Sequence, residues 1–327
     1  MDLGFSRNQT NDLIDIHLCY KIDASFTLIY NPSPSCVLLQ ICLGFIAAVT
    51  ICGNLLVIIS VIYFKQLHTP TNFLVLSLAV ADLLVGLLAF PINMVLTVTS
   101  CLYHYSSFCI VRSAFDRSLC TFSILILCCI SIDRYYAVCQ PLTYRTKMNN
   151  RVIAVMILVI WGAATVISVS IIMAKLSSSC DDEICQIYRN VGNFMGFILA
   201  FYLPVIIMLC IYLKIFLVAL KQARSIQNTK SGATVSKMER KATKTLAVVM
   251  GVFLLCWLPY FLCVSVIVSK KVHVPLSLTE TLNWLSMSNS TINPFIYAFF
   301  YSWFRTAFKM IISGKIFQGN FTNSRLS

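Results

Sequence analysis

Residues 37–63 read VLLQICLGFIAAVTICGNLLVIISVIY, and this stretch contains no charged side chain. A helix needs about 20 apolar residues to cross a hydrocarbon core of roughly 30 Å. Six more runs of similar character follow along the chain, at residues 72–97, 106–139, 151–174, 191–217, 240–268 and 276–300. The sequence therefore predicts seven membrane-spanning helices.

The composition excludes a water-soluble protein. Of the 327 residues, 58% are hydrophobic and 11% are charged, and the mean hydropathy is +0.82. Such values are typical of a polytopic membrane protein. We therefore expect an all-α membrane fold, a seven-transmembrane helix bundle at residues 37–300 between an extracellular tail at 1–36 and a cytoplasmic segment at 301–327. Residues 305–317 alternate basic and apolar side chains, which predicts a short amphipathic eighth helix at the membrane surface.

The basic residues indicate how the chain lies in the membrane. The net charge is +13, but most of the lysines and arginines lie outside the apolar runs, without the aromatic framework that would bind nucleic acid. Asp181, Asp182 and Glu183 fall on the opposite side of a seven-span topology, with the acidic N-terminal tail. Because basic loops stay cytoplasmic, we expect a multi-pass plasma-membrane protein with its N-terminus outside and its C-terminus inside. The sequon at Asn8 then predicts a glycan on the outer side.

Few ionisable side chains lie within the apolar runs, and each asks for a functional account because a charge inside a bilayer costs roughly a few kcal/mol. Asp82 lies in the second run, and Asp116 and Arg134 lie in the third. The latter two are five helical turns apart, so they share one helix face at a separation of about 27 Å. A transporter is disfavoured because the first runs are not repeated in the last ones. An enzyme or light-driven pump is disfavoured because the runs hold no His/Glu metal cluster and the seventh has no lysine for a retinal Schiff base.

The inner end of the third run carries Ser131–Tyr136, SIDRYY, which resembles the Asp-Arg-Tyr motif of rhodopsin-like G-protein-coupled receptors. The other motifs of that family lie in order on the expected runs: Gly53-Asn54, Asp82, Trp161, Pro204, Cys256-Trp257-Leu258-Pro259 and Asn293-Pro294-Phe295-Ile296-Tyr297. Residues 289–304, NSTINPFIYAFFYSWF, match in full the helix-seven signature of the trace-amine-associated receptors. On this resemblance the chain is identified as a member of that subfamily.

The resemblance implies an olfactory receptor, not an enzyme, that senses small amines and raises cyclic AMP through a stimulatory heterotrimeric G protein. A neurotransmitter-type biogenic-amine receptor is the alternative. Asp116 matches the position where amine receptors hold the carboxylate that balances the ligand's ammonium, although a structural acid paired within the bundle would also fit. Arg112 and Arg117 depart from the usual pattern and would repel a cation, so a zwitterionic ligand also remains open.

The rest of the expected ligand site is apolar. Aromatic side chains suited to the body of a small amine occur in the sixth and seventh runs: Trp257, Tyr260, Phe261 and Trp284. Each of them would serve equally well in core packing, and Trp257 is expected to be a switch residue rather than a contact. By resemblance, Met287 stands where many amine receptors carry a tyrosine that hydrogen-bonds the aspartate. Gly196 in the fifth run offers no hydroxyl, which disfavours a catechol ligand.

Two disulfides are expected on the outer side, where the compartment is oxidising. The resemblance pairs Cys109 with Cys185. It also implies a bond from Cys180 to the N-terminal tail, with Cys19 as the first choice of partner and Cys36 as the alternative, because sequence alone does not settle connectivity.

One polar cluster in the middle of the bundle is also inferred from the resemblance. Asp82, Ser123, Asn289 and Asn293 match the residues that hold a sodium ion, whose preferred ligands are hard oxygen atoms. A water-filled hydrogen-bond network without an ion is the alternative, and no other cofactor is expected.

The cytoplasmic end is expected to bind the G protein. Arg134 has two carboxylate partners on offer, Asp133 beside it and Glu239 at the start of the sixth helix. By resemblance, Glu239 is the acid that locks the third and sixth helices together in resting receptors, and Tyr135 and Tyr297 belong to the same activation motifs. The basic segment 221–244 is expected to contact the G protein or anionic membrane lipid.

Overall fold

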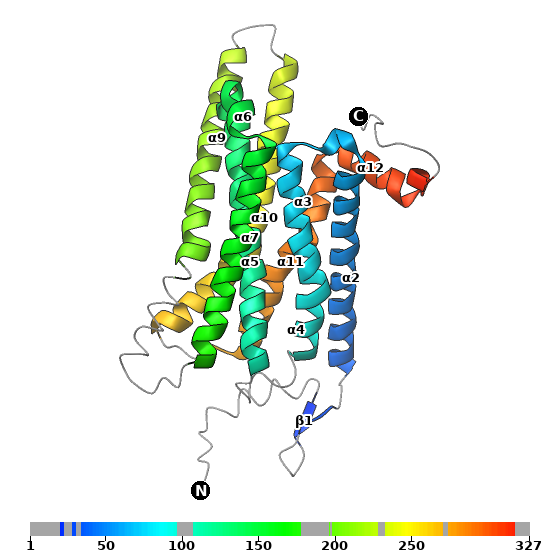
Figure 1. The fold of residues 1–327 in the computed structure, drawn as a ribbon, viewed down its shortest axis with the longest axis vertical. Helices are drawn as coiled ribbons and strands as arrows, with labels where there is room; N and C mark the ends of the chain where they lie inside the picture. Colours follow the sequence, from blue (N-terminus) through cyan, green and yellow to red (C-terminus); the bar gives the residue numbers. More distant parts are fainter. Residues whose placement is uncertain are drawn as a thin grey trace.

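The chain forms a bundle of long helices that run roughly side by side in a computed structural model (Figure 1). The structure describes residues 20–22, 28–30, 34–96, 107–177, 196, 198–227, 233–270 and 274–317. Within these ranges the long elements are α2 (Pro34–Tyr63), α3 (Pro70–Leu84), α4 (Phe90–Leu96), α5 (Ser107–Cys139), α7 (Asn150–Ser177), α9 (Leu203–Gln227), α10 (Ala233–Lys270) and α11 (Leu276–Phe300). Because α3 continues into α4 through a π-turn, η2 (Val85–Ala89), these elements make up the seven helices that the sequence predicts.

Shorter elements lie at the two ends of the bundle. At one end are η1 (Lys65–Leu67), α6 (Pro141–Lys147), α12 (Ser302–Ile312) and η4 (Lys315–Phe317). At the other end, strand β1 (Tyr20–Ile22) pairs antiparallel with β2 (Leu28–Tyr30), so a small hairpin, not foreseen from the sequence, is added to the all-α bundle (Figure 1).

The helix ends differ from the predicted runs where polar residues continue a helix. α9 reaches Gln227 and α10 begins at Ala233, so both extend beyond the apolar runs predicted at 191–217 and 240–268. The eighth helix was predicted over 305–317, but α12 begins at Ser302 and ends at Ile312. Gly314 has a φ of 67°, a conformation that glycine adopts without steric cost and that commonly stops a helix.

Four polar side chains of α11 are buried within the bundle. Among the described residues, five helices are long and apolar enough to cross a membrane: those containing Val37–Tyr63, Pro70–Met94, Ala114–Cys139, Asn150–Ser170 and Val248–Ile267. α9 adds a shorter apolar stretch, Leu203–Val218. α11 is less apolar because it carries Ser286, Asn289, Ser290 and Asn293, all of which are buried. Buried polar groups do not meet lipid, so α11 can span the membrane with this composition.

The helices differ in how much of their surface is buried in the bundle. In the span Pro70–Met94, which runs from α3 through η2 into α4, 61% of the membrane-length segment is buried. In the span Asn150–Ser170 of α7 the buried share is only 22%. α7 accordingly exposes a row of large apolar side chains, among them Val155, Leu158, Val159 and Val166. Such a surface would be a liability in water but is suited to contact with lipid tails.

Gly53 lies on α2 where this helix packs closely against α11. A Cβ atom at this position would stand 3.0 Å from both Cβ and Cγ of Pro294. Gly53→Ala is therefore expected to push the two helices apart and to destabilise the protein by about 1–3 kcal/mol, read as a lower melting temperature after solubilisation. Gly162→Ala is the matched control, because nothing lies within 4 Å of its Cβ and alanine is the better helix former. Equal melting temperatures for the two variants would contradict the close contact.

Candidate functional site

Asp116 lies in the first third of α5 and is half-buried. Its Oδ2 accepts a hydrogen bond of 3.1 Å from Nδ2 of Asn93, which lies on α4 and is fully buried. The same amide nitrogen donates to the carbonyl oxygen of Ala89 at 2.7 Å. The carboxylate expected to bind an ammonium group is therefore held by a neighbouring helix.

The predicted aromatic residues lie in two separate clusters. Trp257 and Phe261 are buried in the main core cluster, where Phe261 stacks on Phe201 at 3.8 Å between ring centroids and makes an edge contact with Tyr260. Trp284 instead packs on Phe90 at 5.4 Å, in a second cluster that contains the buried Met287. The sequence left open whether these residues contact a ligand or pack in the core. In the structure Trp257 and Phe261 pack in the core.

Trp257 also carries an unsatisfied polar atom. Its indole nitrogen is buried without a hydrogen-bond partner in the described part of the chain. A buried donor left without an acceptor costs about 1–3 kcal/mol, and the switch role expected of Trp257 stays a prediction.

Several predicted site residues lie at the edge of what the structure describes. Gly196 is exposed, and nothing lies within 4 Å of the position where a Cβ would stand. Arg117 is half-buried on α5. Arg112, Cys109 and Cys36 lie on helices whose backbone is described, but their side chains are outside the described residues, as is that of Glu239 on α10. Asn8, Cys19, Cys180 and Cys185 lie wholly outside them.

Asp82 lies at the centre of the bundle and is fully buried. Ser290 Oγ donates to its Oδ1 and Asn293 Nδ2 to its Oδ2, both at 2.7 Å. Ser123 and Asn289 are also buried but are not among its hydrogen-bond partners. Both amide atoms of Asn289 lack a partner within the described ranges, so this polar cluster has capacity for a further group.

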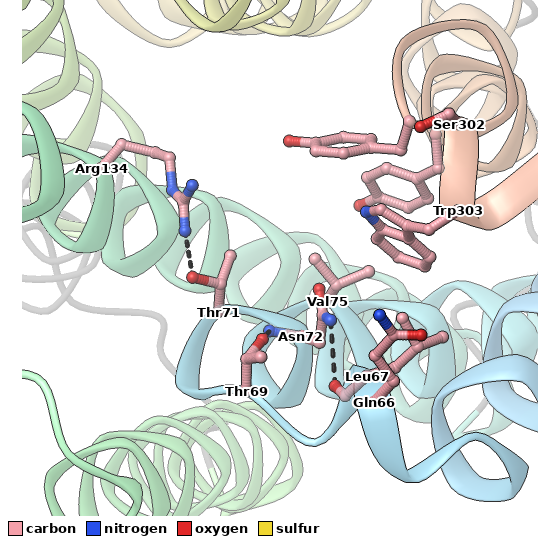
Figure 2. A pocket seen from close by; sticks show the side chains of 11 residues that line it. Gln66, Leu67, Thr69, Thr71, Asn72, Val75, Arg134, Ser302 and Trp303 are labelled. Atoms are coloured by element: carbon pink, nitrogen blue, oxygen red, sulfur yellow. Dashed lines mark hydrogen bonds between the residues drawn. The ribbon is translucent and has the colours of Figure 1, made fainter. Parts of the chain in front are cut away.

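Arg134 lies at the inner end of α5 and is bound to two neighbours. Its guanidinium donates to Oδ2 of Asp133 through Nε at 3.0 Å and Nη2 at 2.5 Å. Nη2 also bonds Thr71 Oγ1 on α3, a contact visible in Figure 2. Thr71 Oγ1 and Tyr144 OH donate to the same carboxylate at 2.7 and 2.9 Å. Of the two carboxylates predicted for Arg134, the structure brings Asp133 to it.

Tyr144 lies on α6, outside the membrane-spanning segments. Burial raises the pKa of its phenol, and the Asp133 carboxylate raises this pKa further. The phenol therefore keeps its proton at neutral pH and remains a donor to Asp133.

A cavity of about 350 Å³ opens beside Arg134 at this end of the bundle (Figure 2). α3, α5, the end of α11 and the start of α12 all contribute to its wall. The lining side chains include Thr71, Asn72, Tyr297, Tyr301 and Ser302. Arg134 is 24% exposed whereas Asp133 is fully buried, so the cavity presents a cation and neutral polar groups.

The two predicted tyrosines at the inner end have different surroundings. Tyr135 is half-buried, its hydroxyl accepts a bond of 3.4 Å from Gln140, and the Lys214 ammonium lies 5.2 Å from its ring centroid. Tyr297 is buried and packs edge-on against Phe304 of α12.

Sequence reasoning missed several partners in these sites. Asn93 and Ser290 gave a usable signal, because each is a polar side chain inside an apolar run. Thr71 and Tyr144 gave none, because each lies outside the apolar runs or at their edge and meets Asp133 only through tertiary packing.

Comparison with known proteins agrees with this arrangement. Residues 53–297 match the family described as 7 transmembrane receptor (rhodopsin family). The chain is 43% identical over 298 residues to Trace amine-associated receptor 1 of Homo sapiens, covering 85% of this chain and 88% of that receptor. It is 40% identical over 331 residues to Trace amine-associated receptor 9 of Homo sapiens, with 95% of each chain covered. Trace amine-associated receptor 4 of Mus musculus is 40% identical over 310 residues, with 89% of each chain covered.

The seven-helix bundle and these matches define a G-protein-coupled receptor of the rhodopsin family, which is a multi-pass plasma-membrane protein and not an enzyme. Within that class, the chain belongs to the trace amine-associated receptors.

Proposed function

We propose that this receptor senses small amines and that Asp116 binds the ligand's ammonium group. The observation that carries the proposal is a half-buried carboxylate in a membrane-spanning helix, held by a hydrogen bond from Asn93. An ionisable side chain within a membrane helix asks for a functional account, because a charge there is costly. The names of the relatives, which refer to trace amines, support the same ligand class.

The cytoplasmic partner in this proposal is a stimulatory G protein, so that an agonist raises cyclic AMP. The N-terminus then lies outside the cell and the C-terminus inside, which agrees with the basic residues of the loops. In this orientation the cavity beside Arg134, which opens at the end of the bundle that carries α12, faces the G protein (Figure 1).

The experiment is a cyclic AMP assay in cells that express the receptor. The panel holds phenethylamine, isopentylamine and dimethylcyclohexylamine, together with the neutral phenethyl alcohol and the zwitterion β-alanine. We expect responses to amines and none to the alcohol, and we expect them to vanish in cells without the stimulatory α-subunit. A response to the alcohol, or to β-alanine alone, would contradict the amine reading.

We further propose that the cluster around Asp82 binds a sodium ion. One buried carboxylate with neutral oxygen atoms nearby suits a monovalent hard cation. The described residues contain no group of three or more His, Cys, Asp or Glu side chains that would favour another metal. The amide oxygen of Asn289, buried without a partner, is available as an additional ligand.

Sodium is expected to raise the melting temperature of the solubilised receptor relative to the same concentration of choline, because an ion that binds only the folded state stabilises it. Asp82→Asn should remove the difference between the two salts. A wild-type receptor that melts at the same temperature in both would indicate a water network instead.

A further inference from the structure

Asn93 reaches Asp116 because of an irregular turn in the second membrane helix. In η2 the backbone N–H of Phe90 bonds the carbonyl of Val85, five residues back, in place of the usual four. The extra residue in this turn changes the direction in which the residues of α4 face relative to α3. It places the Asn93 amide where one nitrogen donates both to Ala89 O at 2.7 Å and to Asp116 Oδ2 at 3.1 Å.

The π-turn is itself held by packing against α2. A Cβ atom at Gly86 would stand 2.9 Å from Cγ1 of Ile51 and 3.3 Å from Cγ2 of Thr50. Only glycine fits this approach without a shift of its neighbours. The turn that aims Asn93 is therefore fixed by contact and not left free to rotate.

An apolar cluster precedes Asn93 on the same stretch of chain. Phe90, Ala89 and Val85 are buried with Leu119 and Met287 in one hydrophobic cluster. The exposed fraction of Asn93 is 0%, so the residue is shielded from solvent. A buried amide in such surroundings is costly unless its hydrogen bonds are made, and one of those bonds goes to the Asp116 carboxylate.

We propose that Asn93 is a positioning residue for ligand recognition: it orients the Asp116 carboxylate from α4 and stabilises its ionised form for the ligand's ammonium. This inference rests on the proposed amine function. A hydrogen bond to the charged form of an acid favours that form, and a fixed carboxylate loses less freedom when a cation binds. Met287, on the α11 side of the same cluster, has no group that could donate such a bond.

The test compares two substitutions that distinguish the effect of the amide's hydrogen bonds from the effect of the side chain's volume. Asn93→Leu keeps the size of the side chain and removes its hydrogen bonds, whereas Asn93→Ala removes both. We expect both variants to lose about tenfold or more in potency for the most potent amine of the panel, with unchanged maximal response. If Asn93 merely fills space, Asn93→Leu keeps wild-type potency and only Asn93→Ala loses it, which would overturn the proposal.

A double-mutant cycle with Asp116→Glu adds a readout that packing would not change. The longer glutamate displaces its carboxylate from the Asn93 amide, so Asn93→Leu should cost much less potency in that background than in the wild type. Equal costs in the two backgrounds would show that Asn93 does not act through Asp116. Where a variant reaches the cell surface poorly, the amine-induced shift in melting temperature of the solubilised receptor replaces potency.

Two controls separate this inference from the function on which it rests. Met94→Leu changes the half-buried neighbour of Asn93 and should leave amine potency unchanged. Asp116→Asn tests the anchor itself. If Asp116→Asn leaves amine potency intact, the proposed function fails. If it abolishes the response while Asn93→Leu has no effect, only the role of Asn93 fails.

Discussion

Asp116→Asn is expected to reduce amine potency by roughly 30- to 5,000-fold. Removing one partner of a desolvated charge pair costs about 2–5 kcal/mol, and each 1.4 kcal/mol is tenfold in affinity. The substitution keeps the shape of the side chain, and Asn93 can still donate to the new amide oxygen, so the local structure should persist. The measurement is the concentration–response curve for cyclic AMP, normalised to receptor at the cell surface.

Asp116→Glu is the matched control, because it keeps the charge and moves it by one methylene. We expect an intermediate loss, smaller than that of Asp116→Asn. Agonist-independent cyclic AMP should be the same in all three receptors, since Asp116 lies about 27 Å from Arg134. The amine-anchor reading would be wrong if Asp116→Asn responded to amines with wild-type potency.

Asp133→Asn is expected to raise cyclic AMP in the absence of any agonist by several-fold. Asp133 is fully buried and accepts bonds from Thr71, Tyr144 and two nitrogens of Arg134. Without its charge, the guanidinium loses its buried counter-ion and is freed to turn into the adjacent cavity. A change of about 1–3 kcal/mol in the resting preference corresponds to roughly 5- to 150-fold in the equilibrium between states.

Tyr144→Phe should give a smaller rise, because it removes one donor to Asp133 and leaves the ion pair in place. Thr146→Ala changes an exposed residue of the same helix, α6, and should have no effect. Basal cyclic AMP at matched surface expression decides between the outcomes. An unchanged basal level in Asp133→Asn would show that the Arg134 network does not restrain the receptor.

The sequence predicted the features that are local in origin. Long apolar runs give membrane helices because the bilayer leaves the backbone no other way to satisfy its hydrogen bonds, and α11 begins and ends at the predicted residues 276 and 300. Charges within those runs identified Asp82, Asp116 and Arg134 as functional candidates, because a bilayer penalises such residues wherever they lie in the fold. Asp133, one of the two carboxylates that the sequence offered to Arg134, could be named because it is the adjacent residue, and the structure shows that ion pair.

The structure decided what depends on contacts between distant segments. An apolar run does not reveal that a π-turn at residues 85–89 aims Asn93 at Asp116, because the turn is held by Ile51 and Thr50 of another helix. From the sequence, the aromatic residues were expected to line one ligand site. Trp257 and Trp284 nevertheless pack in different clusters, because the neighbours of each ring come from other helices.

The sequence by itself therefore determined that this chain has seven membrane helices and which charges they carry, and its motifs gave the resemblance to a receptor family. Hydropathy and charge act residue by residue against the bilayer, so they can be read in one dimension. The tertiary structure alone decided which neutral side chains hold those charges: Asn93 at Asp116, Ser290 at Asp82, and Thr71 with Tyr144 at Asp133. Hydrogen bonds between helices depend on rotation and register, and these are fixed only when the helices pack together.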